Sequence, residues 1–437
     1  MKRGRLPIVK KASMVKKPSP PFPGDHTLQI SNVSIFIFLP LYVLLAAGFH
    51  PAQAQYIPGQ LSNEAEISIL TLGPAEPAYT IFGHTAIRLQ DSTNNIDQVY
   101  NYGTFNTNET NFYLKFLYGN IRYSLSATSF QQFKQTNTAL GRSIINQTLN
   151  LTPSEVNRLA RQLEQNLLPE NRSYQYRFFT RNCVTQVQDL FSEKNLGHSF
   201  GQMPTPVLST STYRQKITPY LVHRPWLHLA INLMLGANAD KNDNQRQHFL
   251  PDDLHLFLAN VTDSSGERAV QSSQTIAKAE IMESNISISP RVLFWGLFLI
   301  VIAFTTISLV NGWQGWWLDR ILFGAVGFAG LIIAFGSLVS LHSPLHNNWN
   351  LLWALPTHLV VTAGMPLLNH RWIQTYFLTV LTLGILVIVG WTFIPQQVPI
   401  VVIPVIGVII IRSTYRVFMA AVAKQDQEKT ELQNDGI

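Results

Sequence analysis

Five long apolar runs in the last third of the chain constrain its fold more than any other feature. The first four approach the roughly 20 residues that a helix needs to cross a bilayer, whereas the fifth is shorter and carries Pro399 and Pro404. We therefore expect an all-α transmembrane domain of five helices within residues 291–413, followed by a cytoplasmic tail, residues 414–437. The runs are Val292–Val310, Ile321–Leu341, Leu351–Leu368, Tyr376–Ile394 and Val398–Ile411.

The positions of the basic residues predict how these helices are oriented. Basic residues lie at one set of ends, whereas the turns 343–348 and 395–397 carry no lysine or arginine; the basic residues are Arg320, Arg371, Arg412, Arg416 and Lys424. Cytoplasmic loops of membrane proteins are enriched in these residues. This bias places the preceding domain outside, which for a bacterial inner-membrane protein means the periplasm.

The N-terminus has the pattern of a secretory signal peptide, residues 1–54. Basic residues crowd into the first 17 positions, an apolar stretch follows at 35–48, and Ala52-Gln53-Ala54 forms a small-x-small cleavage site. The basic region is long, so Met14 is an alternative start, and an uncleaved anchor is an alternative reading. The net charge of +7 thus reflects targeting, and we expect no nucleic-acid partner.

Residues 60–260 have the mixed pattern of an α+β domain. Helices are predicted at 110–118, at 183–191, and after residue 152, where Thr152-Pro153-Ser154-Glu155 is a capping box with proline at the first helical position. The Ser-rich, non-periodic residues 261–290 are interpreted as a linker to the membrane. Short strands are predicted at 66–72, 85–89, 98–102, 121–127, 143–151 and 174–179.

The single cysteine, Cys183, is the candidate nucleophile. It opens a predicted helix, where unpaired backbone N–H groups and a partial positive charge stabilise a thiolate, and Arg181 lies close in sequence. A nucleophilic thiol also needs a base, for which His84 at the start of a strand is the candidate. A third group must fix the histidine tautomer, and Asn101 on the neighbouring strand is our candidate because Tyr100 and Tyr102 face the other way.

The alternatives to this Cys–His pair are a buried structural cysteine and a histidine that is merely hydrogen-bonded. Asp189 is a further candidate for a third member, although its position six residues along the same helix favours a structural ion pair. The spacings contain no metal-binding motif, so we expect neither metal nor cofactor. Other histidines compete for the role of base: His198, His223, His228, His248 and His255.

A polar turn between the second and third apolar runs is a second candidate site. It carries His342, His346 and Asn350, and polar residues at a membrane edge often mark function. An ordinary interfacial loop, with Trp349 in an aromatic belt, is an equally good interpretation. If the turn is functional, it faces the globular domain and helps to bind a lipid head group.

Several motifs in order resemble the Lnb family of lipoprotein N-acyltransferases. The runs SILTLGPAEPAYTIFGHTAIRL, QVYNYGTF, NFYLKFLYGNIRYSL, LNLTPSEV, YQYRFFTRNCVTQVQDLF and HFLPDDL resemble its periplasmic domain, and HSPLHNNWNLLWALP resembles its transmembrane domain. The resemblance implies a permuted papain-like thiol fold, with the histidine strand before the cysteine helix. In that pattern Cys183 matches the nucleophile and His84 the base, whereas Asn101 rests on strand geometry and analogy.

The reaction that this resemblance implies is acyl transfer through a cysteine thioester. A membrane lipid or diacylglyceryl group would donate the acyl chain, and the N-terminal amine of a lipoprotein would accept it. The alternatives are a thiol hydrolase of lipid esters or peptidoglycan peptides, and a non-catalytic envelope assembly protein. The basic N-terminal extension is longer than that of a usual signal peptide, and domains of one fold need not share a substrate.

Overall fold

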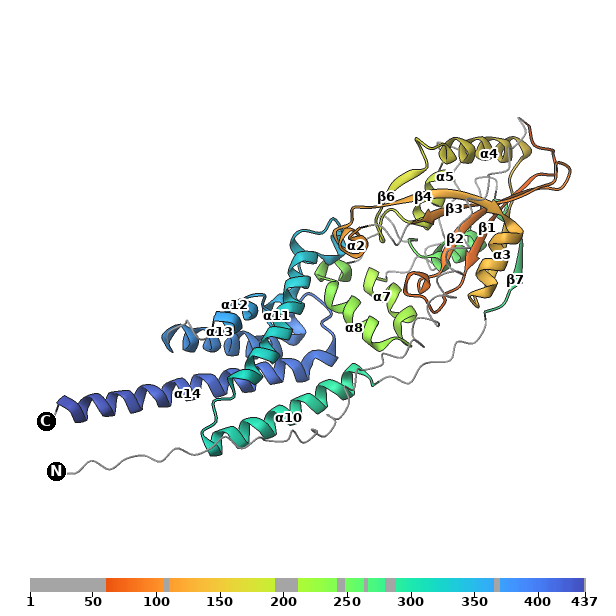
Figure 1. The fold of residues 1–437 in the computed structure, drawn as a ribbon. Coiled ribbons are helices and arrows are strands. Elements are labelled where there is room, and N and C mark those ends of the chain that lie inside the picture. Colours follow the sequence, from red (N-terminus) through yellow and green to blue (C-terminus); the bar gives the residue numbers. More distant parts are fainter. Residues whose placement is uncertain are drawn as a thin grey trace, which may run out of the picture. The chain divides into compact units, whose positions relative to one another are not determined.

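The computed structural model describes residues 60–105, 110–192, 211–241, 248–262, 266–279, 288–364 and 370–435. The predicted signal peptide lies outside the described residues, so its cleavage after Ala54 stays a prediction. An N-terminal part with strands and helices is followed by a helical C-terminal part (Figure 1). The α+β class predicted for the first part is confirmed.

The N-terminal part is built on a seven-stranded sheet in the order β6-β4-β3-β2-β1-β5-β7. All neighbouring strands pair antiparallel. The first six strands lie where the alternation of apolar residues predicts them, with ends that differ by a few residues. The strands are β1 (Glu66–Leu72), β2 (His84–Asp91), β3 (Ile96–Thr104), β4 (Ile121–Ser129), β5 (Ile144–Leu149), β6 (Ser173–Tyr176) and β7 (Val270–Ala277).

Helices cover both faces of this sheet. Ile67 and Ile69 of β1 pack in a core with residues of α4, α5 and α9, whereas Leu70 and Leu72 pack with Phe133 of α3 on the opposite face. Because both faces are covered, every residue of β1 except Glu66 is buried. The covering helices are α3 (Phe130–Ala139), α4 (Pro153–Leu167), α5 (Cys183–Leu190) and α9 (Pro251–Asn260).

The predicted start of α4 is confirmed. The Thr152 side chain accepts the N–H of Glu155, and the Glu155 carboxylate accepts the N–H of Thr152 at 2.8 Å. Pro153 occupies the first turn, where its missing N–H leaves no helical hydrogen bond unmade. These local contacts fix the start of the helix.

The segment 261–290, interpreted from sequence as a linker, contains strand β7. This strand pairs with β5 over Val270–Ala277 and forms one edge of the sheet. Most of its side chains are exposed, which is why no apolar alternation marks it. Its backbone hydrogen bonds to β5, rather than side-chain burial, hold it in the sheet.

A loop of the helical part, residues 340–350, is hydrogen-bonded to elements of the N-terminal part. The N–H of Leu341 donates to the carbonyl of Tyr118 (2.7 Å), and the N–H of Gly236 donates to the carbonyl of Pro344 (3.0 Å). A β-carbon at Gly236 would clash with the carbonyl group of His346, so this approach requires glycine. The loop contacts α2 (Phe112–Tyr118) and the end of α8 (Pro225–Met234). A short helix, α7 (Tyr213–Ile217), precedes α8 in the chain.

Within the described residues, four helices are long and apolar enough to cross a membrane. In the described residues of the third predicted span, Leu351–Leu368, a 3-10 turn ends at Leu352 and α12 (Thr357–Gly364) begins after Pro356, which lacks the N–H that a continuous helix requires. The fifth run, the least secure from sequence, starts a long helix that extends into the predicted tail. The four candidates are in α10 (Pro290–Asn311), α11 (Trp316–Leu338), α13 (His370–Val389) and α14 (Ile403–Asp435).

Two arginines that the sequence assigns to the cytoplasmic side are buried in the helical part. Arg412 and Arg416 of α14 both form ion pairs with Asp319 of α11, and all three side chains are almost completely buried. Thr305 of α10 accepts a further hydrogen bond from Arg412 at 3.0 Å. Charges inside a membrane domain are costly unless paired, so this cluster ties α10, α11 and α14 together.

Candidate active site

Cys183 is the first residue of α5, as predicted. The preceding residue, Asn182, caps the helix: its side chain accepts the N–H of Thr185, and the Thr185 hydroxyl accepts the N–H of Asn182. The amide of Asn182 also donates to the carbonyl oxygens of Phe178 and Phe249, each at 2.7 Å. These bonds fix the position at which the helix, and with it the cysteine, begins.

The sulfur of Cys183 lies against the start of β2. The backbone N–H of Thr85, the residue after His84, donates a hydrogen bond to it. The ladder that pairs β2 with β3 begins only at Ile87 and Tyr100, so the first residues of β2 lie beyond it. Helix α5 packs against both strands at this end of the sheet. The structure therefore brings Cys183 and the His84–Thr85 peptide into one site.

His84 and Asn101 lie on the same face of the sheet and are hydrogen-bonded. The distance from His84 Nε2 to Asn101 Oδ1 is 2.6 Å. A carbonyl oxygen only accepts, so Nε2 carries the proton and Nδ1 is left with a free lone pair. Tyr100 and Tyr102 point into the core on the other face, as strand alternation predicts. The catalytic roles of these residues stay predictions.

Gly103 makes room for the imidazole, and sequence reasoning did not identify it. Its φ is +140°, in the region that favours glycine, and a β-carbon there would lie 3.1 Å from His84 Cε1. The same β-carbon would be 3.9 Å from Asn101 Oδ1. The Asn101-Tyr102-Gly103 sequence on β3 thus provides both a hydrogen-bond acceptor and the space for the ring.

Arg142 is a second residue that sequence reasoning missed. It precedes β5 and is only 5% exposed. Its Nε donates to the carbonyl of Gly73 (2.9 Å), and its Nη1 donates to Asn137 Oδ1 (3.1 Å). The charge of its guanidinium acts on both Cys183 and His84. The cation of this site is therefore Arg142, whereas Arg181, which we expected near the thiol, lies 5.8 Å from the ring centroid of Tyr174.

Burial controls the ionisation of both candidate residues. It raises the pKa of the Cys183 thiol, and the N–H groups of Thr85 and Val184 and the charge of Arg142 oppose this rise without cancelling it. Burial, followed by the charge of Arg142, lowers the pKa of His84 to about 4, although the bond to Asn101 opposes the shift. The resting site thus holds a thiol and a neutral imidazole. The net effect on the thiol is opposite to that expected from the helix start alone.

The competing candidates lie elsewhere. His248 packs 4.9 Å from the ring of Phe257, the carbonyl of His255 accepts from Gln147, and His198 is outside the described residues. Asp189 lines a separate cavity. Among the residues that the structure describes, no group of three or more metal-ligating side chains could hold a metal ion.

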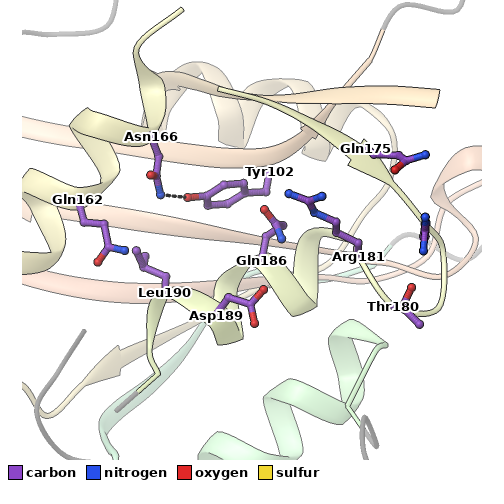
Figure 2. A pocket seen from close by; sticks show the side chains of 10 residues that line it. Tyr102, Gln162, Asn166, Gln175, Thr180, Arg181, Gln186, Asp189 and Leu190 are labelled. Carbon is purple, nitrogen blue, oxygen red and sulfur yellow. Dashed lines mark hydrogen bonds between the residues drawn. The ribbon is translucent and has the colours of Figure 1, made fainter. Parts of the chain in front are cut away.

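That cavity has a volume of about 700 Å³ and lies between α4, α5 and β6. Figure 2 shows Tyr102 hydrogen-bonded to Asn166, with Arg181 and Asp189 on the same wall. Tyr102 points to the face of the sheet opposite Asn101, and neither Cys183 nor His84 lines the cavity. It is a polar cavity distinct from the Cys183 site.

The outward turn lies against the N-terminal part, and its predicted binding residues hold it there. His342 Nε2 is 3.0 Å from the carbonyl oxygen of Phe116 on α2, and His346 Nε2 is 2.7 Å from that of Ser340. Asn350 is fully buried and donates to the carbonyl of Leu233 on α8. These contacts give the three residues a part in packing the turn, while lipid binding by them stays a prediction.

Comparison with known protein families finds two matches along the chain. Residues 53–217 match the Lnb N-terminal periplasmic domain, and residues 281–424 match the Lnb transmembrane domain. Neither a curated protein nor a solved structure matches the chain. The two matches occur in the order of the two parts described above and together include every residue of the Cys183 site.

Proposed function

The chain belongs to the Lnb family, and from that membership and the geometry of the site we propose that it is a cysteine-dependent lipoprotein N-acyltransferase. It is embedded in the membrane and has a periplasmic N-terminal domain. The observations that carry the proposal are the bond between His84 and Asn101 and the position of the Cys183 sulfur at the N–H of Thr85, the residue after His84. A permuted papain-like arrangement of these three residues is part of the same proposal.

The neutral pair supports transfer of a proton at the moment of attack. His84 Nδ1 takes the proton of the thiol while the sulfur of Cys183 attacks the ester carbonyl of a membrane lipid or diacylglyceryl group. The tetrahedral intermediate then collapses: the carbon–oxygen ester bond breaks, and the alcohol leaves with the proton from His84. A thioester on Cys183 remains.

The second half of the reaction returns the enzyme to its starting state. The N-terminal amine of a lipoprotein attacks the thioester carbonyl and gives one proton to His84. The carbon–sulfur bond breaks, an amide forms, and the sulfur recovers its proton from the imidazolium. Asn101 keeps the ring in the tautomer that can act as base, because its oxygen holds the proton on Nε2.

The membrane part supports this choice of substrates. The acyl donor and the lipid-anchored acceptor both reside in the bilayer, and the loop 340–350 connects the helical part to α2 and α8 by hydrogen bonds. A hydrolase of peptidoglycan peptides requires no such attachment, because the wall lies away from the bilayer. We therefore favour acyl transfer over peptidoglycan hydrolysis, and membership of the family favours it over hydrolysis of lipid esters.

Mass spectrometry of lipoprotein N-terminal peptides tests the proposal. In a strain that lacks this gene, we expect lipoproteins with a free N-terminal amine, and plasmid-borne wild-type protein should restore the amide-linked acyl chain. Cys183→Ala should accumulate to the wild-type level without restoring it. Unchanged N-acylation in the deletion strain, or restoration by Cys183→Ala, would reject the proposal.

A further inference from the structure

One nitrogen of the Arg142 guanidinium has no partner although it is buried. Nε and Nη1 are occupied by Gly73 and Asn137, and Nη2 has no hydrogen bond within the described structure. A buried donor without a partner is unfavourable, and more so when it carries a charge. The Arg142 side chain is 5% exposed, and its unpaired Nη2 is available to a group that binds there.

The topology places this donor at the Cys183 site. Ile144 of β5 pairs with Leu72 of β1, and Leu72 pairs with His84 of β2. Arg142 lies two residues before Ile144, and its bond to Gly73 holds the guanidinium over the end of β1. The free N–H is thus supported by the strand next to His84, and its charge reaches Cys183.

The side chain is held rigidly in this position. The Asn137 amide donates to the carbonyl of Phe133 at 2.8 Å, which turns its oxygen toward Arg142 Nη1. The backbone N–H of Arg142 also donates to the carbonyl of Asn137. Contacts from α3 and from the end of β1 therefore fix two edges of the guanidinium. This matters because a donor that is held in place before the reaction stabilises developing charge more than a mobile donor does.

We propose that Arg142 binds the oxygen that becomes negatively charged during acyl transfer: its free Nη2–H donates to the carbonyl oxygen of the acyl donor as Cys183 attacks. This inference rests on the proposed function. When the sulfur adds to the carbonyl carbon, the carbon–oxygen π pair moves onto that oxygen, and the cation stabilises it until the ester bond breaks. The same positive charge destabilises the imidazolium form of His84. The increase in acylation rate therefore comes from the direct bond between Arg142 Nη2 and the carbonyl oxygen.

Other titratable groups surround Cys183, and none of them supplies a positive charge. Tyr123, Tyr174 and Tyr176 lie within electrostatic range of the thiol, and Tyr79 acts on Arg142. All four are phenols with no positively charged form. Among the groups identified at the site, the cation available to an oxyanion is Arg142.

The test uses the full-length protein in detergent micelles and two acyl donors, p-nitrophenyl octanoate and a vesicle phospholipid. The first has no phosphate, so it separates binding of the carbonyl oxygen from binding of a head group. Acylation of Cys183 is followed by the initial release of p-nitrophenolate or by mass spectrometry of the thioester. We expect Arg142→Gln to slow acylation by both donors about 100-fold, as removal of an oxyanion donor does in other enzymes.

Arg88→Gln is the matched control, because Arg88 lies on the same strand and face as His84 but is fully engaged with Asp97 and Phe130. It should acylate at the wild-type rate. Should Arg142→Gln fail to fold, Arg142→Lys decides: its ammonium cannot keep both supporting bonds, and acylation should fall at least about tenfold.

Three results would overturn the inference. A folded Arg142 variant that acylates at the wild-type rate shows that the arginine is structural. A loss confined to the phospholipid shows that Arg142 binds a head group instead. A wild-type protein that forms no thioester on Cys183 refutes the proposed function and the inference together, whereas the first two results leave the proposed function intact.

Discussion

Replacement of Gly103 by alanine tests whether the space around the imidazole matters for function. The new β-carbon would lie 3.1 Å from His84 Cε1, about 0.5 Å closer than ordinary carbon–carbon contacts of about 3.5–4.0 Å. The ring must therefore move by roughly that distance. The 2.6 Å bond to Asn101 would lengthen or bend, and the imidazole would leave its position beside Cys183.

The expected effect on rate is larger than the effect on stability. Alanine at a φ of +140° costs about 1–3 kcal/mol of folding free energy. Misplacement of a catalytic group by about 1 Å can cost about 100-fold in rate, so a shift of half that size should slow acyl transfer roughly 10- to 100-fold. The assay is amide formation on a synthetic diacylglyceryl lipopeptide by the protein in proteoliposomes, with thermal unfolding measured in parallel.

Gly266→Ala separates backbone strain from the contact with His84. Gly266 also has a positive φ, +87°, but nothing lies within 4 Å of a β-carbon built there. This variant should lose a similar amount of stability and keep its activity. Equal activities of Gly103→Ala and Gly266→Ala would refute the reasoning, because the contact with the imidazole would then have no consequence.

Three further predictions concern ionisation and packing. The pKa of His84 is about 4 in the folded protein and 6.5 in the unfolded chain, so the unfolded chain binds the proton first as the pH falls. Between pH 6.5 and 4, the wild type should therefore lose up to about 3 kcal/mol of folding free energy relative to His84→Gln. Parallel pH profiles of the two proteins in urea unfolding would contradict this. Gly236→Ala should expose the loop 340–350 to proteolysis, since its β-carbon would clash with that loop, whereas Gly324→Ala, with nothing within 4 Å, should not. Asp319→Asn leaves two buried arginines of α14 without a counter-charge and should cost about 3–5 kcal/mol, seen as a lower melting temperature in detergent; an unchanged melting temperature would contradict the importance of this cluster.

Local patterns predicted the elements that carry the candidate site. Alternation of apolar residues located the strands, and Asn182 before an apolar helical pattern located the start of α5. The same alternation placed Asn101 on the face of the sheet opposite to Tyr100 and Tyr102, where it now meets His84. These inferences depend only on residues close in sequence or on directly adjacent strands, which is why single-sequence reasoning reached them.

Long-range contacts explain what the sequence did not predict. Arg142 joins the site only because β5 pairs with β1 and β1 with β2, and no local pattern distinguishes it from other basic residues. Gly103 lies at an irregularity in the pairing of β3 with β4, and its contact with His84 of the neighbouring strand depends on a pairing that no local pattern shows. Strand β7 is polar because it lies at an edge, and the third apolar run is interrupted by a proline that a hydropathy average ignores.

The opposing effects on Cys183 show the same limit. The helix start lowers the thiol pKa, as the sequence indicates, and so does Arg142, a cation that the sequence did not identify, but burial outweighs both. Burial depends on how α5 packs against β2 and β3, which is a property of the whole sheet. In the proposed reaction the Cys183 thiol therefore gives its proton to His84 during attack, and no standing thiolate is required.

The most direct test of the account is the mass of the Cys183 peptide after the purified protein has been mixed with an acyl donor and no acceptor amine. We predict that this peptide gains the mass of one acyl chain, that hydroxylamine removes it, and that an added diacylglyceryl lipopeptide receives it as an amide. A lipopeptide that is N-acylated while Cys183 is replaced by alanine would contradict the account.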